Sequence, residues 1–152
     1  MTKLLSNHFS LEEFTTSQTA AREGIDNTPD ATVQRNLRTL AEALERVRTA
    51  LGDKPVVISS GYRSKALNSA IGGSSTSAHM TGLAVDFIVP TFGTVLQTAK
   101  AISACGLGGD QLIYEYGRWV HLGLAAAGKT PRGQLLSIGS RKTYVTGLTD
   151  NC

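Results

Sequence analysis

The stretch Ser77-Ala78-His79-Met80-Thr81-Gly82-Leu83-Ala84-Val85-Asp86 decides how this chain is interpreted. It leads from a Gly- and Ser-rich loop into an expected strand over residues 83–89, where alternation puts Asp86 on one face with Ala84 and Ile88. A carboxylate among apolar neighbours is costly unless it is paired or bound to a metal ion. His79 lies earlier, and Gly82 lets the chain turn so that both side chains can reach one ion. The stretch therefore favours two ligands of a metal site.

His121, within Trp119-Val120-His121-Leu122, is a third candidate ligand on a later expected strand. Two imidazoles and one carboxylate leave the fourth position of a tetrahedral zinc ion open, as in hydrolytic sites. A single histidine near an apolar strand is more often an ordinary core or surface residue, so the case for Zn²⁺ depends on the three residues together. His8 has no such pattern around it and is given no role.

Length and composition fit one globular domain over residues 1–152, with 41% apolar and 18% charged residues. The formal charge of +3 comes from scattered Lys and Arg residues, which does not indicate nucleic-acid binding but suits a polyanionic matrix such as a bacterial cell wall. No closely spaced cysteine pair exists that could hold zinc. We expect Cys105 to be a small core residue and Cys152 an exposed thiol.

No stretch near the N-terminus is apolar enough for a signal peptide, and no segment approaches the length of a membrane span. We therefore expect a protein that is made in the cytoplasm without a signal peptide and is not inserted into a membrane.

The chain is expected to begin with an irregular lead-in over residues 1–28, which contains a short helix capped by Ser10 with Glu13 as the reciprocal acceptor. A long helix should follow, with Thr28 as its N-cap and Gly52 as its stop. Its core-facing stripe recurs at spacings of three and four residues and consists of Val33, Leu37, Leu40, Leu44, Val47 and Leu51.

The rest of the chain alternates between short strands and two further helices, which predicts an α+β domain. The expected elements are a buried strand at 56–59, a helix from Ser64 to Ala70, the strand at 83–89, a helix over 92–105, strands at 111–116 and 118–124 joined by a turn at Gly117, and one or two edge strands between 134 and 145 in the C-terminal part, residues 130–152.

Three motifs together resemble the zinc D-Ala-D-Ala peptidase family, most closely the branch that includes many bacteriophage cell-wall peptidases. They are Ser77-x-His79-x-x-Gly82-x-Ala84-x-Asp86, the preceding Ser59-Ser60-Gly61-Tyr62-Arg63-Ser64 and the following Trp119-Val120-His121. The resemblance implies a small, mainly antiparallel sheet flanked by helices. It also implies that His79, Asp86 and His121 bind Zn²⁺, and that the protein hydrolyses an amide bond in the peptide part of peptidoglycan.

The same resemblance implies the biological setting, a phage endolysin or a virion-associated lysin. Its partners would be peptidoglycan stem peptides and, in a particle, virion proteins; it would reach the cell wall after holin-type release or within a virion. The bond that is cleaved stays open among D-Ala–D-Ala, D-Ala–diaminopimelate and L-Ala–D-Glu. An alternative is a zinc-containing virion protein that binds peptidoglycan without cleaving it.

The resemblance also assigns roles beside the metal. Arg63 matches the family arginine that faces the substrate, where it would stabilise the oxyanion, and Ser77 is expected to contact substrate. Many members carry Glu three residues before the last histidine ligand, but this chain has Arg118 there. A tight hairpin would bring Glu115 beside His121 instead, which makes Glu115 the expected general base.

Asp110 is the second candidate for the general base. It could also orient a histidine ligand from outside the metal site.

Overall fold

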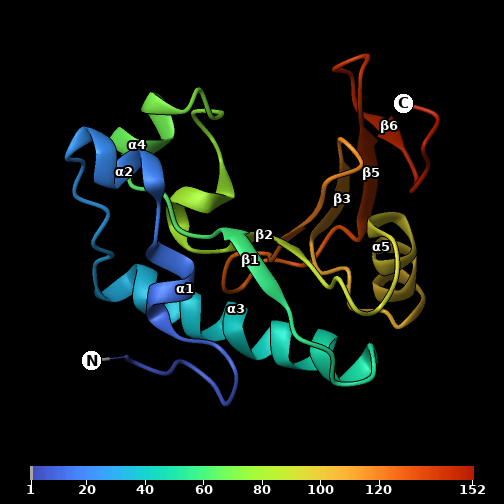
Figure 1. Ribbon diagram of the computed structural model, residues 1–152, viewed down its shortest axis with the longest axis horizontal. Helices are drawn as coiled ribbons and strands as arrows, with labels where there is room; N and C mark the ends of the chain where they lie inside the picture. Colours follow the sequence, from blue (N-terminus) through green and yellow to red (C-terminus); the bar gives the residue numbers. More distant parts are fainter. Residues whose placement is uncertain (1) are drawn as a thin grey trace. The chain divides into compact units, whose positions relative to one another are not determined.

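The computed structural model describes residues 2–152 (Figure 1). Its residues group into two compact units, each built from two stretches of chain: Met1–Glu45 with Ser60–Val85, and Arg46–Ser59 with Asp86–Cys152. The expectation of a single domain over residues 1–152 stays a prediction. The α+β class is confirmed, because helices accompany a mixed sheet.

The first unit contains short helices, each begun by a polar cap. α1 (Leu11–Thr15) starts with the predicted capping box, in which Ser10 accepts from the Glu13 amide and the Glu13 carboxylate accepts from the Ser10 amide. α2 (Gln18–Glu23) was not expected, so the lead-in is less irregular than predicted. Ser17 caps its start, and Gly24, with a φ of 65°, ends it.

Two more helical segments of this unit lie next to Arg63 or contain His79. α4 (Lys65–Ala70) begins where Ser64 accepts a hydrogen bond from the Leu67 amide, as predicted. A 3₁₀ turn, η1 (Ala78–Thr81), occupies part of the motif stretch that was expected to be loop and strand entry. It ends at Gly82, whose φ of 77° favours glycine.

The long helix α3 (Ala31–Ala50) has the predicted buried stripe but a different cap. All six stripe residues are at most 8% exposed. The Asp30 carboxylate, rather than Thr28, accepts from the Val33 amide at 2.8 Å. The cap prediction was wrong because Asp30 is closer to the first free amides, so it can reach them while Thr28 cannot. Gly52, with a φ of 83°, follows the helix as expected.

The strands that the structure describes form one sheet in the order β1-β2-β4-β3-β5-β6. The bounds are β1 Val57–Ser60, β2 Ala84–Ile88, β3 Gln111–Glu115, β4 Trp119–Gly123, β5 Gln134–Ile138 and β6 Val145–Thr146. β3 pairs antiparallel with β4 but parallel with β5, and β5 pairs antiparallel with β6. The prediction of C-terminal edge strands is therefore wrong for β5, which has a neighbour on each side.

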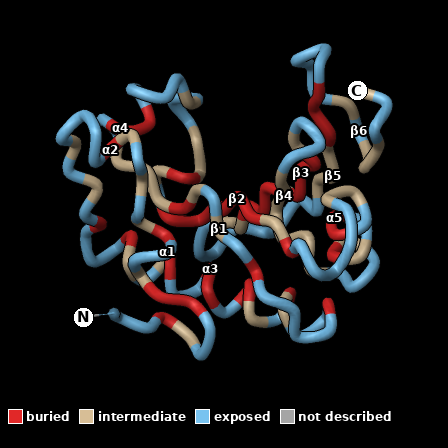
Figure 2. Tube along the Cα trace, in the orientation of Figure 1, coloured by how far each residue is buried: buried red, intermediate tan, exposed pale blue. Residues whose placement is uncertain are grey.

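Burial differs between β2 and β1, the strand that was expected to be buried. Four of the five residues of β2 are buried, which Figure 2 shows as a red segment. β1 is instead only partly covered: Val57 is 48% exposed, and the buried valine is Val56, just before the strand. The prediction of a buried strand at 56–59 is thus corrected.

In the second unit, α5 (Val95–Ala104) packs on β3 and β4. It starts later than predicted, because Thr94 and Gln97 form a capping box there. Cys105 lies just past the last helical residue and is exposed, so the expectation of a core cysteine is wrong. Cys152 is half-buried rather than exposed. Throughout residues 2–152, no helix is both long enough and apolar enough to cross a membrane.

Candidate metal centre

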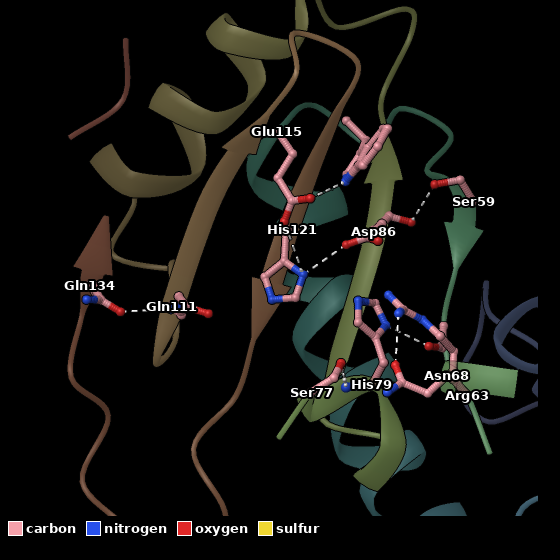
Figure 3. A network of polar contacts seen from close by, with 12 residues as sticks. Ser59, Arg63, Asn68, Ser77, His79, Asp86, Gln111, Glu115, His121 and Gln134 are labelled. Atoms are coloured by element: carbon pink, nitrogen blue, oxygen red, sulfur yellow. Dashed lines mark hydrogen bonds and ion pairs between the residues drawn. The ribbon is translucent and has the colours of Figure 1, made fainter. Parts of the chain in front are cut away.

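His79, Asp86 and His121 each offer one ligand atom, and these atoms all lie within 4.8 Å of one another. His79 comes from η1, Asp86 from β2 and His121 from β4 (Figure 3). The three residues are 3%, 6% and 8% exposed, respectively. Burial of a carboxylate and two imidazoles is costly unless hydrogen bonds or a cation compensate for the lost water. The three sequence-predicted ligands are thus brought together.

The ring of His79 is fixed in one tautomer. Its Nδ1 lies 2.7 Å from the carbonyl oxygen of Gly61. A carbonyl only accepts hydrogen bonds, so Nδ1 carries a proton and donates it, and Nε2 is the ring nitrogen that can bind a metal. A histidine that binds metal typically donates its other ring nitrogen to such a partner. His79 therefore presents Nε2 as a ready ligand.

His121 and Asp86 approach each other directly within the second unit. His121 Nδ1 lies 2.9 Å from Asp86 Oδ1, and the Asp86 carbonyl accepts a hydrogen bond from Ser59 Oγ at 3.2 Å. Side chains of β4 alternate between faces, so Trp119 and Gly123 share the face of His121. A nitrogen and an oxygen donor this close suit a small cation that binds both nitrogen and oxygen ligands. The set of two imidazoles and one carboxylate fits Zn²⁺.

Glu115 lies beside His121, as the hairpin prediction required. Residue 115 is opposite Trp119 in the β3–β4 pair, and Ile113 is opposite His121. Opposed residues share a face, so the carboxylate of Glu115 reaches diagonally along that face and places Oε1 3.8 Å from His121 Nδ1. Figure 3 shows Glu115 next to His121.

The turn that produces this geometry depends on Tyr116 and Gly117. Both have positive φ, 56° and 65°, and the Arg118 amide donates to the Glu115 carbonyl at 2.9 Å. Positive φ at both central residues is the requirement of a type I′ turn, which matches the twist of paired strands. The tight turn predicted at Gly117 is confirmed.

Arg63 is held close to His79 within the first unit. Its backbone amide donates to the His79 carbonyl at 3.1 Å, and its Nη1 donates to Asn68 Oδ1 at 3.2 Å. Asn68 is itself 3% exposed and donates to the carbonyl of Ser74. A Cβ on Gly73 would overlap Asn68 Oδ1 and lie 2.9 Å from Arg63 Nη1, so only glycine leaves this pair undisturbed.

Ser77 and Asp110 have structural partners that sequence reasoning did not foresee. Ser77 Oγ caps η1 by accepting from the His79 amide at 3.2 Å. Asp110 precedes β3 and binds Arg132 through both carboxylate oxygens, at 2.7 Å for the shortest contact. Hydrogen bonds from Arg132 hold the pKa of Asp110 below its usual value. These contacts favour Glu115 over Asp110 as a proton acceptor.

Sequence reasoning missed two aromatic residues near Glu115. Trp119 Nε1 donates to Glu115 Oε2 at 3.0 Å, which the shared face in the hairpin would have indicated. Burial, followed by the charges of Glu115, Tyr116 and Asp86, raises the pKa of Tyr144. No local signal in the sequence places Tyr144 near Glu115 or Asp86, which lie far from it in the sequence.

A sequence model described as peptidase M15 matches residues 7–123. The chain belongs to the peptidase M15 family. It is also similar to the zinc D-Ala-D-Ala carboxypeptidase of Streptomyces albus G, with 43% identity over 56 residues, which are 37% of this chain and 22% of that protein. The chain thus matches less than a quarter of the length of this relative.

Membership in the peptidase M15 family confirms the resemblance drawn from the motifs, and the mixed sheet flanked by helices is consistent with that family. The matched range includes all three clustered ligands as well as Arg63 and Glu115. Zinc is the metal that this M15 donor set fits.

Proposed function

We propose that this M15 chain is a zinc metallopeptidase that hydrolyses an amide bond in the peptide part of bacterial peptidoglycan. His79, Asp86 and His121 would hold the metal. The observation that carries the proposal is the position of Glu115, whose carboxylate lies 3.8 Å from the His121 imidazole. The same imidazole contacts Asp86. When bound, zinc would supply a Lewis acid that polarises the scissile carbonyl and lowers the pKa of water.

Glu115 acts as the general base in this proposal. Trp119 holds Oε2, which leaves Oε1 directed toward His121. Oε1 takes a proton from the attacking water as its oxygen bonds to the carbonyl carbon. The same proton then passes to the nitrogen of the leaving amine as the carbon–nitrogen bond breaks. The products are a carboxylate and a new amino terminus.

Arg63 stabilises the negative charge that develops on the carbonyl oxygen. Its guanidinium is directed by Asn68 and its backbone is tied to His79, so the donor is oriented before substrate arrives. Pre-oriented donors lower the barrier because they need no rearrangement when the charge forms. Ser77, the other predicted substrate contact, fixes the amide of His79 and would act near the same end of the substrate.

The biological setting that we propose is a phage endolysin or a virion-associated lysin. The support is the motif resemblance to the branch rich in bacteriophage cell-wall peptidases. The net charge of +3 also suits an anionic cell wall. Peptidoglycan stem peptides are the proposed substrate class, and virion proteins are the partners expected if the chain is carried in a particle.

The deciding experiment measures release of amino groups from purified sacculi by the wild-type protein and by Glu115→Gln. The substitution keeps the shape of the side chain but removes the proton acceptor, so we expect a loss of at least about a hundredfold with zinc content unchanged. His121→Ala should lose both zinc and activity, as elemental analysis would show. Mass spectrometry of the digested walls would identify the cleaved bond.

Two further variants separate the alternatives. Glu42→Gln, which removes an exposed carboxylate on α3, is the control and should behave as wild type. Asp110→Asn tests the rival base: a large loss there with near-normal activity in Glu115→Gln would assign the proton transfer to Asp110. Zinc-loaded wild-type protein that binds sacculi without releasing amino groups would identify a binding protein instead of an enzyme.

A further inference from the structure

A pocket of about 580 Å³ opens at the tip of the β3–β4 hairpin, in the second unit. Its walls come from two parts of the chain: Tyr114, Tyr116, Arg118 and Trp119 on the hairpin, and Ser140 and Asp150 in the C-terminal segment. Only the hairpin wall lies within residues 7–123, the range that matches the M15 family. One wall of the pocket therefore lies outside the region that matches the family.

The C-terminal wall is fastened to the hairpin by specific contacts. The Tyr114 hydroxyl donates to Asp150 Oδ1 at 2.6 Å, and the Tyr116 amide donates to the Ile138 carbonyl at 2.8 Å. A Cβ on Gly139 would lie 2.9 Å from the Cys152 carbonyl oxygen, so glycine there permits a close approach of the last residues. These contacts hold the two walls of the pocket together.

Trp119 connects the pocket to the proposed base. Its indole lines the pocket while its Nε1 donates to Glu115 Oε2 at 3.0 Å. A substrate group in the pocket would thus lie against the same side chain that positions Glu115.

Arg118 is the basic residue among the lining residues, and together with the aromatic walls it favours a ligand that carries an anionic group beside an apolar part. Arg118 is exposed at the hairpin tip, where its guanidinium can bind a carboxylate through two parallel hydrogen bonds. Tyr116 and Trp119 form a tilted aromatic pair, with ring centroids 5.6 Å apart, which offers apolar faces. Asp150, the acidic residue of the lining, is engaged by the Tyr114 hydroxyl.

We propose that this pocket is a specificity subsite that binds a carboxylate-bearing residue of the substrate peptide. Arg118 pairs with the carboxylate, and the rings of Tyr116 and Trp119 cover the aliphatic part of the same residue. The inference depends on the proposed function, because it names the part of the substrate that the site reads. It also gives a role to Arg118, which occupies the position where many family members carry Glu.

The test uses the fact that Trp119 is the one tryptophan of the chain, so its emission reports on the pocket. Zinc-loaded protein is mixed by stopped flow with the tetrapeptide L-Ala-γ-D-Glu-diaminopimelate-D-Ala, and emission is read before turnover. The second ligand is the same peptide with the free D-Glu carboxyl amidated. We expect the acid to bind about 10- to 100-fold more tightly than the amide, the usual range for a charge-assisted pair.

Three variants make the result specific. Arg118→Ala should bind both peptides equally and weakly, Arg118→Lys should recover part of the preference, and Arg46→Ala, which removes an exposed charge on α3, should match wild type. An unchanged preference in Arg118→Ala, or an equal emission change with peptide-free glycan, would overturn the subsite. Binding with the expected preference but without release of amino groups from sacculi would leave the subsite standing and reject the proposed hydrolase.

Discussion

Arg63 shows how a single side chain can be directed by neighbours of little chemical interest. Asn68 Oδ1 accepts a hydrogen bond from Arg63 Nη1, and the side-chain amide of Asn68 donates to the Ser74 carbonyl. Gly73 has no side chain and so leaves the space that Arg63 and Asn68 need. The guanidinium is oriented by packing and by hydrogen bonds rather than by solvent. Its direction should therefore depend on Gly73 as much as on Asn68.

Arg63→Ala should leave zinc bound and lower the rate of sacculus hydrolysis by roughly two to three orders of magnitude, the usual loss of one oxyanion donor. Gly73→Ala should cost at least about tenfold through displacement of Arg63, since misplaced groups lose rate steeply. Both are measured as kcat on purified sacculi together with zinc content. Gly72→Ala is the control for backbone strain, because its φ of 75° is unfavourable for alanine while its Cβ would meet no neighbouring atom. Equal losses at positions 72 and 73 would show that loop strain, and not Arg63, is responsible.

At the level of elements, the sequence predicted those structural features that depend on residues close together in the chain. The stripe of α3 follows from helical periodicity, and the β3–β4 hairpin follows from alternation on both sides of Gly117. The capping box at Ser10 also depends on a nearby residue, because its partner, Glu13, lies three positions away. These features could be predicted because their physical causes lie within a few residues.

Other elements depend on contacts between distant residues and could not be predicted in the same way. β5 pairs in parallel with β3, with Gln111 opposite Gln134, and nothing near residue 134 specifies that partner. The candidate ligands were predicted from their motifs. The contact of Trp119 with Glu115 could have been inferred from their shared face in the hairpin, but the approach of Tyr144 required the folded chain.

The cap of α3 gives a quantitative test at this scale. Asp30→Ala should lower the free energy of unfolding by about 1 kcal/mol, because the Val33 amide loses its acceptor. Thr28→Ala should change the free energy of unfolding by no more than a few tenths of a kcal/mol, because Thr28 does not reach the first turn. Urea denaturation followed by circular dichroism measures both values. A larger effect at Thr28 than at Asp30 would restore Thr28 as the cap.

For the molecule as a whole, polar contacts hold the C-terminal segment in place within the second unit, and one of them, from Tyr114 to Asp150, involves groups that titrate. Ser137 Oγ donates to the Gly147 carbonyl at 2.7 Å and accepts from the Thr149 amide at 3.0 Å. The Tyr114 hydroxyl adds its bond to Asp150. Burial, and then this hydrogen bond, raise the pKa of Tyr114 to about 12.

Alkaline conditions should therefore weaken this attachment. The folded protein holds the phenol proton more tightly than the unfolded chain, whose tyrosine pKa is near 10. The resulting stabilisation is complete below about pH 10 and is lost as the pH rises through about 12. Tyr114→Phe has no such proton, so the wild type should lose about 1–3 kcal/mol more than the variant between those pH values. Urea midpoints at several pH values measure the difference; parallel curves would contradict it.

The composition of the pocket walls has a consequence for protein engineering. The clustered ligands, Glu115 and Arg63 all precede residue 124, whereas Ser140 and Asp150 belong to a tail outside the matched range. Sequence diversity introduced only at Ser140 and Asp150 would reshape one wall and would leave Tyr144, which lies near Glu115, as it is. We expect libraries of this kind to change which peptides the proposed subsite binds while residues 7–123 stay constant, much as exchangeable loops redirect binding on a fixed scaffold.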